Sequence, residues 1–370
     1  MWQTRAMAPP KNRRRRSGSG AGKTARPVTL KTLAASLDLS PATVSVVLNR
    51  SPVADSIPQS TQDRVFDAAR RLKYRPNYLA RSLRRQRSFS VGVLVPEISE
   101  GYAAGVMSGI EGLLLQEGYF YLVASHRTKH DLLEEYLELL KDRLVEGFIL
   151  VNTPLEKAPE LPAVAVSGHR ALEGVTNVVV DHDLAATLAL SHLAELGHRR
   201  IAFFKGHAHS ADTEARWQGI RKAADSLGLE LRSELVLELG SEVEGKVFSP
   251  EESFEEGYAF GRQLLAIDPR AGRRPFTALF AFNDVSAIGA MRAFLDAGLS
   301  VPDEVSVVGF DDIHSAAFQN PSLTTVRQPL REMGESASRI LLERLSGEAS
   351  GPEEVTVEPQ LMVRGSTGPA

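Results

Sequence analysis

The residues that could support chemistry in this sequence are a glycine-rich segment near the N-terminus and two pairs of closely spaced histidines. The segment GSGAGKT ends like a phosphate-binding loop, but Ser17 stands where that loop needs its first glycine, and four arginines replace the buried strand that must precede it. His126 and His130 are four residues apart and His207 and His209 are two apart, but both pairs fall in expected loops without a convincing carboxylate partner. The sequence therefore indicates neither a nucleotide site nor a metal site, and we expect no cofactor.

The composition excludes several further classes of protein. The chain has 370 residues and no cysteine, which rules out disulfides, zinc-thiolate sites and thiol nucleophiles. No apolar run approaches the roughly 18 residues that a membrane helix needs, and no apolar segment follows the charged N-terminus as a signal peptide would require. No nucleophile elbow or acid–base carboxylate pair is evident. We therefore expect a cytoplasmic protein that is not an enzyme and does not bind a membrane.

The formal net charge of −3 hides an asymmetry along the chain. Residues 1–90 contain 19 lysines and arginines against four acidic residues, so this part is strongly basic and the remainder is strongly acidic. Such a division is typical of a protein whose first part binds a polyanion. The alternative is a disordered cationic tail beside an ordinary acidic domain. Residues 1–26 are rich in Pro, Arg, Ser and Gly and predict a flexible basic arm.

Short polar side chains recur where two short helices are expected. Thr29 is placed to cap the first helix and Ser40 the second, with Asp38 at the turn between them. Two helices joined by a tight turn let the second one enter the major groove of DNA, with its first residues at the base edges. A plain three-helix structural bundle, with a third helix over residues 61–72, is the alternative. The candidate DNA contacts in this segment are Thr29, Leu30, Ser40, Pro41, Ala42, Ser45, Val46 and Asn49.

A short basic segment follows the helical cluster. Pro76 and Asn77 would open a helix that carries apolar residues on one side and arginines on the other. This combination suits a minor-groove wedge, in which an apolar side chain opens a base step while cations hold phosphates. The alternative is an interdomain helix that packs on its neighbour. The candidate DNA contacts here are Tyr74, Asn77, Ala80 and Leu83.

From residue 90 onward, apolar strand-like runs alternate with amphipathic helices. This pattern predicts parallel sheets covered on both faces, and about 280 residues of it are too many for one small sheet, so we expect two doubly wound subdomains. The expected strands cover residues 91–95, 119–124, 147–151, 163–166, 177–180, 200–204, 278–281 and 305–309. The expected helices cover residues 104–116, 132–143, 184–196, 214–227, 254–266, 285–297 and 330–344.

A ligand site is expected between these subdomains, because parallel α/β sheets bind ligands at the carboxyl ends of their strands. An aromatic face combined with Asp, Asn and Arg suits a sugar, whose ring packs on tyrosine while polar groups bind its hydroxyls. The alternative is that each acidic or basic residue is only a cap or a structural ion pair, which applies most strongly to His126. The candidate effector-binding residues are Tyr102, Ser125, Arg170, Arg216, Asn283 and Asp311.

Several motifs together resemble the lac-repressor (LacI/GalR) family of transcriptional regulators. Residues 28–49 (VTLKTLAASLDLSPATVSVVLN) are similar to its headpiece, and YRPN at 74–77 to the start of its hinge helix. The resemblance extends over about residues 27–366. The downstream motifs that carry it are GVLVP at 92–96, VEGFI at 145–149, LGHRRIA at 196–202, AFND at 281–284, VSVVGFDDI at 305–313 and LTTVRQP at 323–329.

The resemblance implies an all-α helix-turn-helix headpiece with a hinge helix, followed by an α/β sensor similar to periplasmic sugar-binding proteins. It implies a homodimer that binds a near-palindromic double-stranded DNA operator, with Leu83 of each hinge helix wedged at the central step, and a small-molecule effector. The C-terminal residues 357–370 show no heptad pattern, so we expect a dimer and not a tetramer. The implied boundaries are 1–26 for the arm, 27–75 for the headpiece, 76–89 for the hinge, 90–181 with 330–357 for one sensor subdomain, and 182–329 with 358–370 for the other.

The chain departs from the family pattern at a few positions. Val46 stands where many members carry Arg or Ala, which favours an apolar contact with a thymine methyl. Asp38 replaces the usual turn glycine, and aspartate enters left-handed conformations more easily than most residues. Ala103 replaces a second aromatic and predicts a roomier pocket. A solute-binding sensor without operator function is the alternative to the regulator as a whole.

Overall fold

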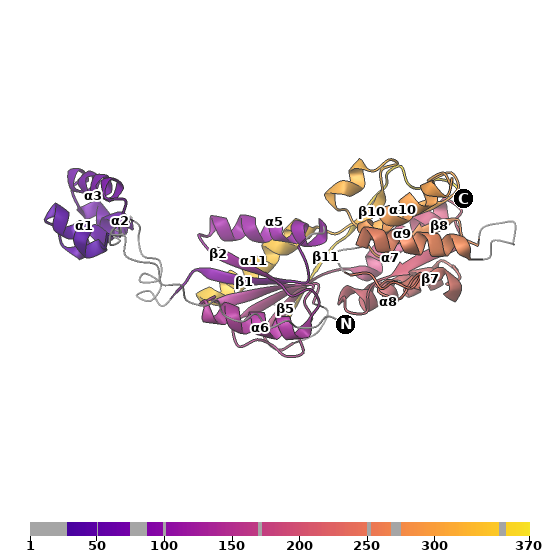
Figure 1. The fold of residues 1–370 in the computed structure, drawn as a ribbon, viewed down its shortest axis with the longest axis horizontal. Coiled ribbons are helices and arrows are strands. Elements are labelled where there is room, and N and C mark those ends of the chain that lie inside the picture. Colours follow the sequence, from indigo (N-terminus) through magenta and orange to yellow (C-terminus); the bar gives the residue numbers. More distant parts are fainter. Residues whose placement is uncertain are drawn as a thin grey trace, which may run out of the picture. The chain divides into compact units, whose positions relative to one another are not determined.

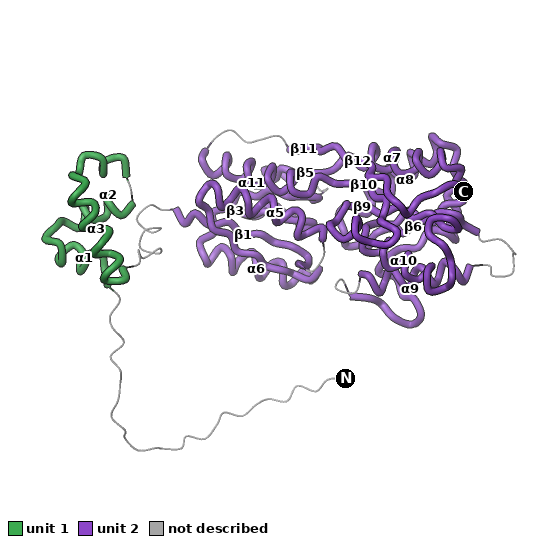
Figure 2. The backbone as a smooth tube through the Cα atoms, turned by 90° about the horizontal axis from the view of Figure 1, so that it is seen from above, with its two compact units in different colours: residues 1–84 green, residues 85–370 purple. Residues whose placement is uncertain are grey.

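The computed structural model describes residues 28–49, 51–74, 87–98, 101–168, 172–249, 253–267, 275–347 and 353–370. The chain forms two compact units, residues 1–84 and 85–370, drawn in green and purple in Figure 2. The expected basic arm and residues 76–86 of the expected hinge helix, with Asn77, Ala80 and Leu83, lie outside the described residues, and residues 87–89 are not helical.

The first unit is a cluster of short helices whose ends are set by side-chain caps. The Oγ1 of Thr29 accepts from the backbone N–H of Thr32 at 3.2 Å, and the Oγ of Ser40 accepts from that of Thr43 at 3.0 Å. Asp38 ends the first helix in the left-handed region, with φ of 55°, as expected from its replacement of a turn glycine. The helices are α1 (Leu30–Leu37), α2 (Pro41–Leu48), the 3₁₀ helix η1 (Pro52–Ser56) and α3 (Gln59–Arg71).

A small apolar core holds these helices together. The Nε2 of Gln62 on α3 also donates to the backbone carbonyls of Ala54 and Ile57, each at 2.9 Å, which fixes the segment between α2 and α3. Because few side chains are buried in this unit, its one apolar core must hold α2 in position. Its buried members are Leu33, Ala34, Leu37, Val44, Val47, Val65 and Ala68.

The second unit begins with a six-stranded parallel sheet in the order β11-β5-β4-β3-β1-β2 (Figure 1). Its central strands are buried along their whole length, as expected for a sheet covered on both faces. Helices α5 (Gly101–Gln116) and α11 (Leu330–Ser346) cover one face and α6 (His130–Asp142) the other. The strands are β1 (Ser90–Val95), β2 (Phe120–Ser125), β3 (Gly147–Val151), β4 (Ala163–Val166), β5 (Val175–Val180) and β11 (Glu354–Val357).

The other sheet of this unit has the order β12-β10-β9-β8-β6-β7 and is parallel except for the β10–β12 pair. Helices α7 (His182–Glu195) and α8 (Asp212–Ser226) cover one face, and α9 (Ser253–Ala266) and α10 (Asp284–Asp296) cover the other. Two 3₁₀ helices, η2 (Ser233–Leu235) and η4 (His314–Phe318), lie in its connections. The strands are β6 (Ile201–Lys205), β7 (Val236–Glu238), β8 (Ala278–Phe280), β9 (Ser306–Asp311), β10 (Thr324–Arg327) and β12 (Gln360–Met362).

The chain passes between the two sheets three times. The passages lie between β5 and α7, between β10 and α11, and between β11 and β12. Because α11 returns to the first sheet, it packs against α5, and two glycines allow a close backbone approach. A Cβ at Gly109 would lie 2.0 Å from the carbonyl oxygen of Arg331, and one at Gly334 would lie 2.1 Å from that of Val106. Each subdomain is therefore built from segments far apart in sequence.

The predicted fold class is confirmed, and the expected strands and helices of this unit are present with ends shifted by a few residues. Strands β7, β10, β11 and β12 were not expected. Each has only three or four residues and lacks a continuous apolar run, so periodicity alone could not identify it. Among the described residues, no helix is long and apolar enough to cross a membrane.

Arg344 on α11 should contribute to the stability of the first subdomain. Its guanidinium donates to the backbone carbonyls of Ala163 and Gly174 at 2.7 and 2.8 Å and to the Oγ1 of Thr176 at 2.6 Å. We expect Arg344→Ala to lower the free energy of unfolding by about 2–3 kcal/mol, because these acceptors lose a charged donor. Chemical denaturation followed by circular dichroism measures the change. Arg339→Ala, at an exposed position of the same helix, is the matched control and should change it by less than about 0.5 kcal/mol. Equal effects of the two substitutions would contradict this role.

Candidate functional site

The start of α2 presents a small exposed surface in the first unit. Pro41 and Ala42 are exposed in its first turn, and Asn49 is exposed at its C-terminal end. Ser45 and Val46 lie between them and are half-buried. Two of the residues that we expect to read bases therefore lie in the exposed first turn of α2. A recognition helix places this turn in the major groove.

Other expected DNA contacts already have structural roles. The hydroxyls of Thr29 and Ser40 serve as helix caps, and Leu30 and Tyr74 pack partly buried against the headpiece core. Asn49 donates through Nδ2 to the carbonyl of Ser45 at 2.7 Å. A cap hydroxyl remains exposed and can still contact a phosphate, but its first task here is to hold the helix start.

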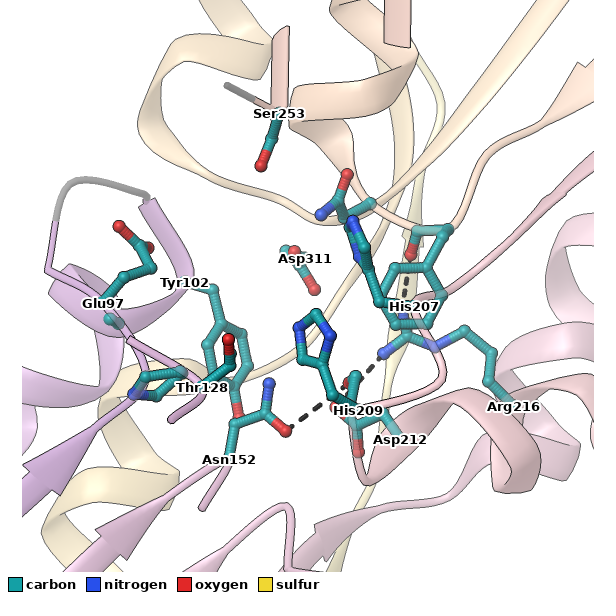
Figure 3. Close-up of a pocket in the computed structure, with 15 residues that line it drawn as sticks. Glu97, Tyr102, Thr128, Asn152, His207, His209, Asp212, Arg216, Ser253 and Asp311 are labelled. Carbon is teal, nitrogen blue, oxygen red and sulfur yellow. Dashed lines mark hydrogen bonds and ion pairs between the residues drawn. The ribbon is translucent and has the colours of Figure 1, made fainter. Parts of the chain in front are cut away.

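In the second unit, a pocket lies between the carboxyl ends of the two sheets (Figure 3). Four of the expected effector residues line it: Tyr102, Arg216, Asn283 and Asp311. Ser125 is not among its lining residues, and its hydroxyl donates to the carbonyl of Pro96 at 3.1 Å. Arg170 lies outside the described residues. The other lining residues are Pro96, Glu97, Ala103, Thr128, Asn152, His207, His209, Ser210, Asp212, Ser253 and Phe282.

Arg216 is a buried charged residue that lines this pocket, with 3% of its surface exposed. Its Nη1 donates to the carbonyl of Phe282, and its Nη2 lies 3.5 Å from the Oδ2 of Asp212. The guanidinium carbon stands 4.3 Å from the centre of the Phe282 ring and 3.6 Å from that of Phe310. The Nε has no hydrogen-bond partner. The Nε of Arg216 is therefore a buried donor that no protein atom accepts.

Asp311 ends β9 in a strained conformation and is 5% exposed. Its φ of 111° lies in the region that favours glycine, and such strain in a non-glycine residue is concentrated at functional sites. Its Oδ1 accepts from the Nε2 of Gln328 at 2.6 Å. Burial raises the pKa of Asp311 to about 7, although the nearby Arg216 acts in the opposite direction.

Tyr102 and Asn283 each make one hydrogen bond within the protein and keep another part of the side chain for the pocket. The hydroxyl of Tyr102 donates to the Oγ of Ser167 at 2.8 Å, and burial together with the charge of Asp212 raises the pKa of this phenol. The Oδ1 of Asn283 caps α10 by accepting from the backbone N–H of Ser286 at 2.9 Å. Its amide nitrogen is therefore left as a donor beside the pocket, while the tyrosine ring supplies an aromatic face.

The histidines lie closer to the pocket than the sequence suggested. The Nε2 of His207 lies 2.8 Å from the Oε2 of Glu256, a buried residue of α9, and the rings of His207 and His209 are 4.9 Å apart. Burial and the neighbouring His207 lower the pKa of His209 to about 4. Among the described residues, no group of three or more His, Cys, Asp or Glu residues could hold a metal ion.

His126 is buried beside the pocket and has a structural partner. Its Nε2 lies 3.0 Å from the Oγ1 of Thr153, which itself donates to the carbonyl of Val151 at 2.8 Å, so the imidazole is the donor. Burial lowers the pKa of His126 to about 4. The contacts of His126 therefore favour a structural role for this residue over a role in ligand binding.

Simple signals could have identified several of the missed lining residues. His207 and His209 follow the end of β6, and Asn152 follows β3, so the rule that selected Asp311 applies to them equally. Asp212 precedes Arg216 by one helical turn, which is the spacing of an ion pair. The same rule applies to Glu97 after β1 and to Thr128 after β2, whereas no local pattern predicts that Ser253, at the start of α9, reaches the same pocket.

The comparisons with known proteins agree with this architecture. Residues 190–367 match the model of a periplasmic binding protein-like domain. The HTH-type transcriptional repressor PurR of Mannheimia succiniciproducens is 30% identical over 347 residues, which cover 91% of this chain and 98% of that protein. A complex of the transcriptional regulator CelR with cellobiose superimposes with a TM-score of 0.64 at 29% identity, over 92% of this chain and 100% of that one.

The lac repressor bound to ONPG in its repressed state is also similar. It superimposes with a TM-score of 0.78 at 25% identity, over 92% of this chain and 100% of that one. These similarities span the helical unit and the two-sheet unit together, and they confirm the expected class of regulator. This chain belongs to the lac-repressor (LacI/GalR) family of helix-turn-helix transcriptional regulators.

Proposed function

We propose that this protein is a ligand-responsive repressor that binds a near-palindromic DNA operator as a homodimer and takes a sugar-like effector in the cleft of its second unit. The observation that carries this proposal is a similarity to named repressors over 91% of the chain, which includes both the headpiece and the sensor. The cytoplasm is the compartment in which such a protein would meet its operator.

The exposed first turn of α2 would read the operator. Pro41 and Ala42 would approach base edges in the major groove, with Val46 and Asn49 further along the helix. Tyr74 and the hinge residues Asn77, Ala80 and Leu83 are proposed to act in the minor groove. One headpiece makes few base contacts, so two linked copies would be needed for useful affinity and for matching operator symmetry.

The cleft supports a sugar-like effector through its mixture of groups. The ring of Tyr102 offers an apolar face, and Arg216, Asn283 and Asp311 offer donors and an acceptor around it. A solved relative, CelR, is described in complex with cellobiose, which is a sugar. Ser125 and Arg170 remain proposed contributors in the neighbouring loops.

Effector binding would act on DNA affinity by changing how the two subdomains close on each other. Asp311 is hydrogen-bonded to Gln328, which lies between β10 and α11 on one of the three passages between the sheets. A ligand that binds one closed arrangement more tightly shifts the population toward it. This shift would then reach the hinge segments that precede β1.

The first test is a selection of bound DNA from random duplexes, repeated in the presence of pooled sugars. A near-palindromic sequence with a central pyrimidine–purine step is expected, and a pooled sugar that changes binding identifies the effector class. No enrichment at low salt would instead favour a solute-binding sensor without operator function.

Ala42→Glu should weaken operator binding at least tenfold, because it places a carboxylate in the exposed first turn of α2 next to DNA phosphates. A glutamate is tolerated at a helix N-terminus, so the headpiece should remain folded. Fluorescence anisotropy with the selected operator measures the affinity. Ala35→Glu adds the same charge on an exposed part of α1 and should change affinity less than twofold. Comparable losses in both variants would argue against α2 as the reading helix.

Effector affinity should rise with pH around neutrality. Because the pKa of Asp311 is about 7, its carboxyl group changes from mostly protonated at pH 6 to mostly ionised at pH 8, and the charged form is the stronger acceptor for hydroxyl groups. We expect an increase of up to about tenfold, following the ionised fraction. Isothermal titration with the sugar found in the pool measures it, and Asp311→Asn should bind weakly and without this pH dependence. The same dependence in the variant would assign it to another group.

A further inference from the structure

We propose that the basic arm, residues 1–26, is a second DNA-binding element that holds the phosphates on either side of the operator. This inference rests on the proposed function and deepens it, because it assigns a partner to a segment that operator reading by the headpiece leaves unused. The arm lies outside the described residues. The inference is carried by the sequence of the arm and by the charges of the headpiece to which it is joined.

The helix that we expect to read bases carries no charge. Helix α2 has the sequence PATVSVVL, so none of its side chains can form an ion pair with a phosphate. Affinity for DNA depends largely on cationic side chains that neutralise phosphates and release their counterions. The first unit must therefore obtain this part of its affinity from residues outside α2.

The rest of the headpiece adds little positive charge. Residues 28–74 hold six lysines and arginines against four aspartates. Two of the arginines are already engaged within the unit. Arg64 donates through Nη2 to the carbonyl of Leu37 at 3.1 Å, and Arg70 forms an ion pair with Asp67. The strong basic character of the first 90 residues therefore does not come from the folded headpiece.

That charge lies in the segments before and after the headpiece. Residues 1–26 contain eight lysines and arginines and no acidic residue, and four of the arginines are consecutive, at positions 13–16. An extended chain advances about 3.3–3.6 Å per residue, and one DNA strand presents a phosphate about every 3.4 Å. A run of consecutive arginines therefore matches the density of charge along a phosphate backbone.

The arm joins the headpiece on a helix that packs against the reading helix. It leads into Thr29, the exposed cap of α1, and α1 contributes with α2 to the same apolar core. Fully extended, 26 residues span on the order of 90 Å, whereas one helical turn of DNA rises by about 34–36 Å. The arm can therefore reach phosphates beyond the half-site that α2 would contact, and its tether raises its effective concentration there.

The acidic second unit is a weaker partner for the arm than DNA is. Its carboxylates are spread over many elements, and several already have cationic partners, as in the ion pairs of Lys141 with Glu160 and of Lys222 with Asp183. Duplex DNA carries one negative charge about every 1.7 Å, and arginine can bind a phosphate through two parallel hydrogen bonds. The density of charge therefore favours DNA.

Glutamine substitutions in the full-length protein test the inference. The glutamine variant combines Arg13→Gln, Arg14→Gln, Arg15→Gln and Arg16→Gln, and its operator affinity is measured by fluorescence anisotropy over a range of salt concentrations. The slope of log affinity against log salt should become shallower by about 2–7, because each phosphate contact contributes about 0.9 and a homodimer has two arms. An unchanged slope overturns the inference.

The length of the duplex gives a second readout. One duplex holds the operator alone, and the other extends it by about one helical turn on each side. The unsubstituted protein should bind the longer duplex at least about threefold more tightly, because the arms gain phosphates to contact. The glutamine variant should bind both duplexes equally. The same preference for the longer duplex in the variant would assign the flanking contacts to another part of the protein.

Two control variants separate the charge of the arm from overall charge and from arginine geometry. Arg143→Gln, Arg221→Gln, Lys222→Gln and Arg339→Gln together remove the same charge from exposed positions of the second unit and should leave the slope unchanged. Lysine at positions 13–16 keeps the charge and should keep the slope to within about 1. A loss in the first control equal to that in the glutamine variant, or a lysine variant that behaves like the glutamine variant, contradicts binding of phosphates by the arm.

The same measurements separate this inference from the proposed function. If the selected operator binds and the glutamine variant keeps the slope, the arm has no such role and the repressor stands. If the glutamine variant binds the operator more tightly, the arm opposes DNA binding and the inference is wrong. If selection yields no operator, the slope is measured on a duplex of random sequence. A shallower slope there supports the arm although operator reading has failed, and an unchanged slope rejects both.

Discussion

The buried guanidinium of Arg216 is the interaction on which the cleft depends. A charge with 3% of its surface exposed must be paired and hydrogen-bonded, because an uncompensated charge in this environment costs several kcal/mol. Here Asp212, the carbonyl of Phe282 and two aromatic rings meet that requirement. In doing so they hold α8, the loop after β8 and the end of β9 around one point. The pocket takes its shape from this arrangement.

The three passages of the chain between the two sheets connect that pocket to the rest of the protein. Neither sheet is formed by a continuous segment, since β11 and α11 return to the first sheet after the second has been built. Asp311, at the end of β9, is hydrogen-bonded to Gln328 on one of these passages. A group that faces the pocket is thereby linked directly to a segment that any closure of the subdomains must move, which is the physical basis for ligand response under the proposed function.

The headpiece is stabilised by different interactions. It has a small apolar core, and side-chain caps from Thr29 and Ser40 define where its helices begin. The same short polar residues that look suited to DNA contacts therefore also hold the helices in place. Buried residues such as Val44 and Val47 fix one side of α2, and Pro41 and Ala42 are left exposed on it. Under the proposed function, one side of this short helix would read DNA while the other side holds the headpiece together.

Local patterns in the sequence were enough to determine the helix caps, the alternation of strands and helices, the two-part organisation and four of the pocket residues, because each depends on periodicity or on the residue that follows a strand. The conformation of Asp38 was also predictable from its residue type. The short strands β10, β11 and β12 were decided only by tertiary structure, since they are stabilised by neighbours distant in the chain. The pairing of His207 with Glu256 and the engagement of Arg216 by Phe282 and Phe310 also join separate segments. The sequence alone could therefore predict where a pocket lies, but the contacts of its charged residues join segments that only the folded chain brings together.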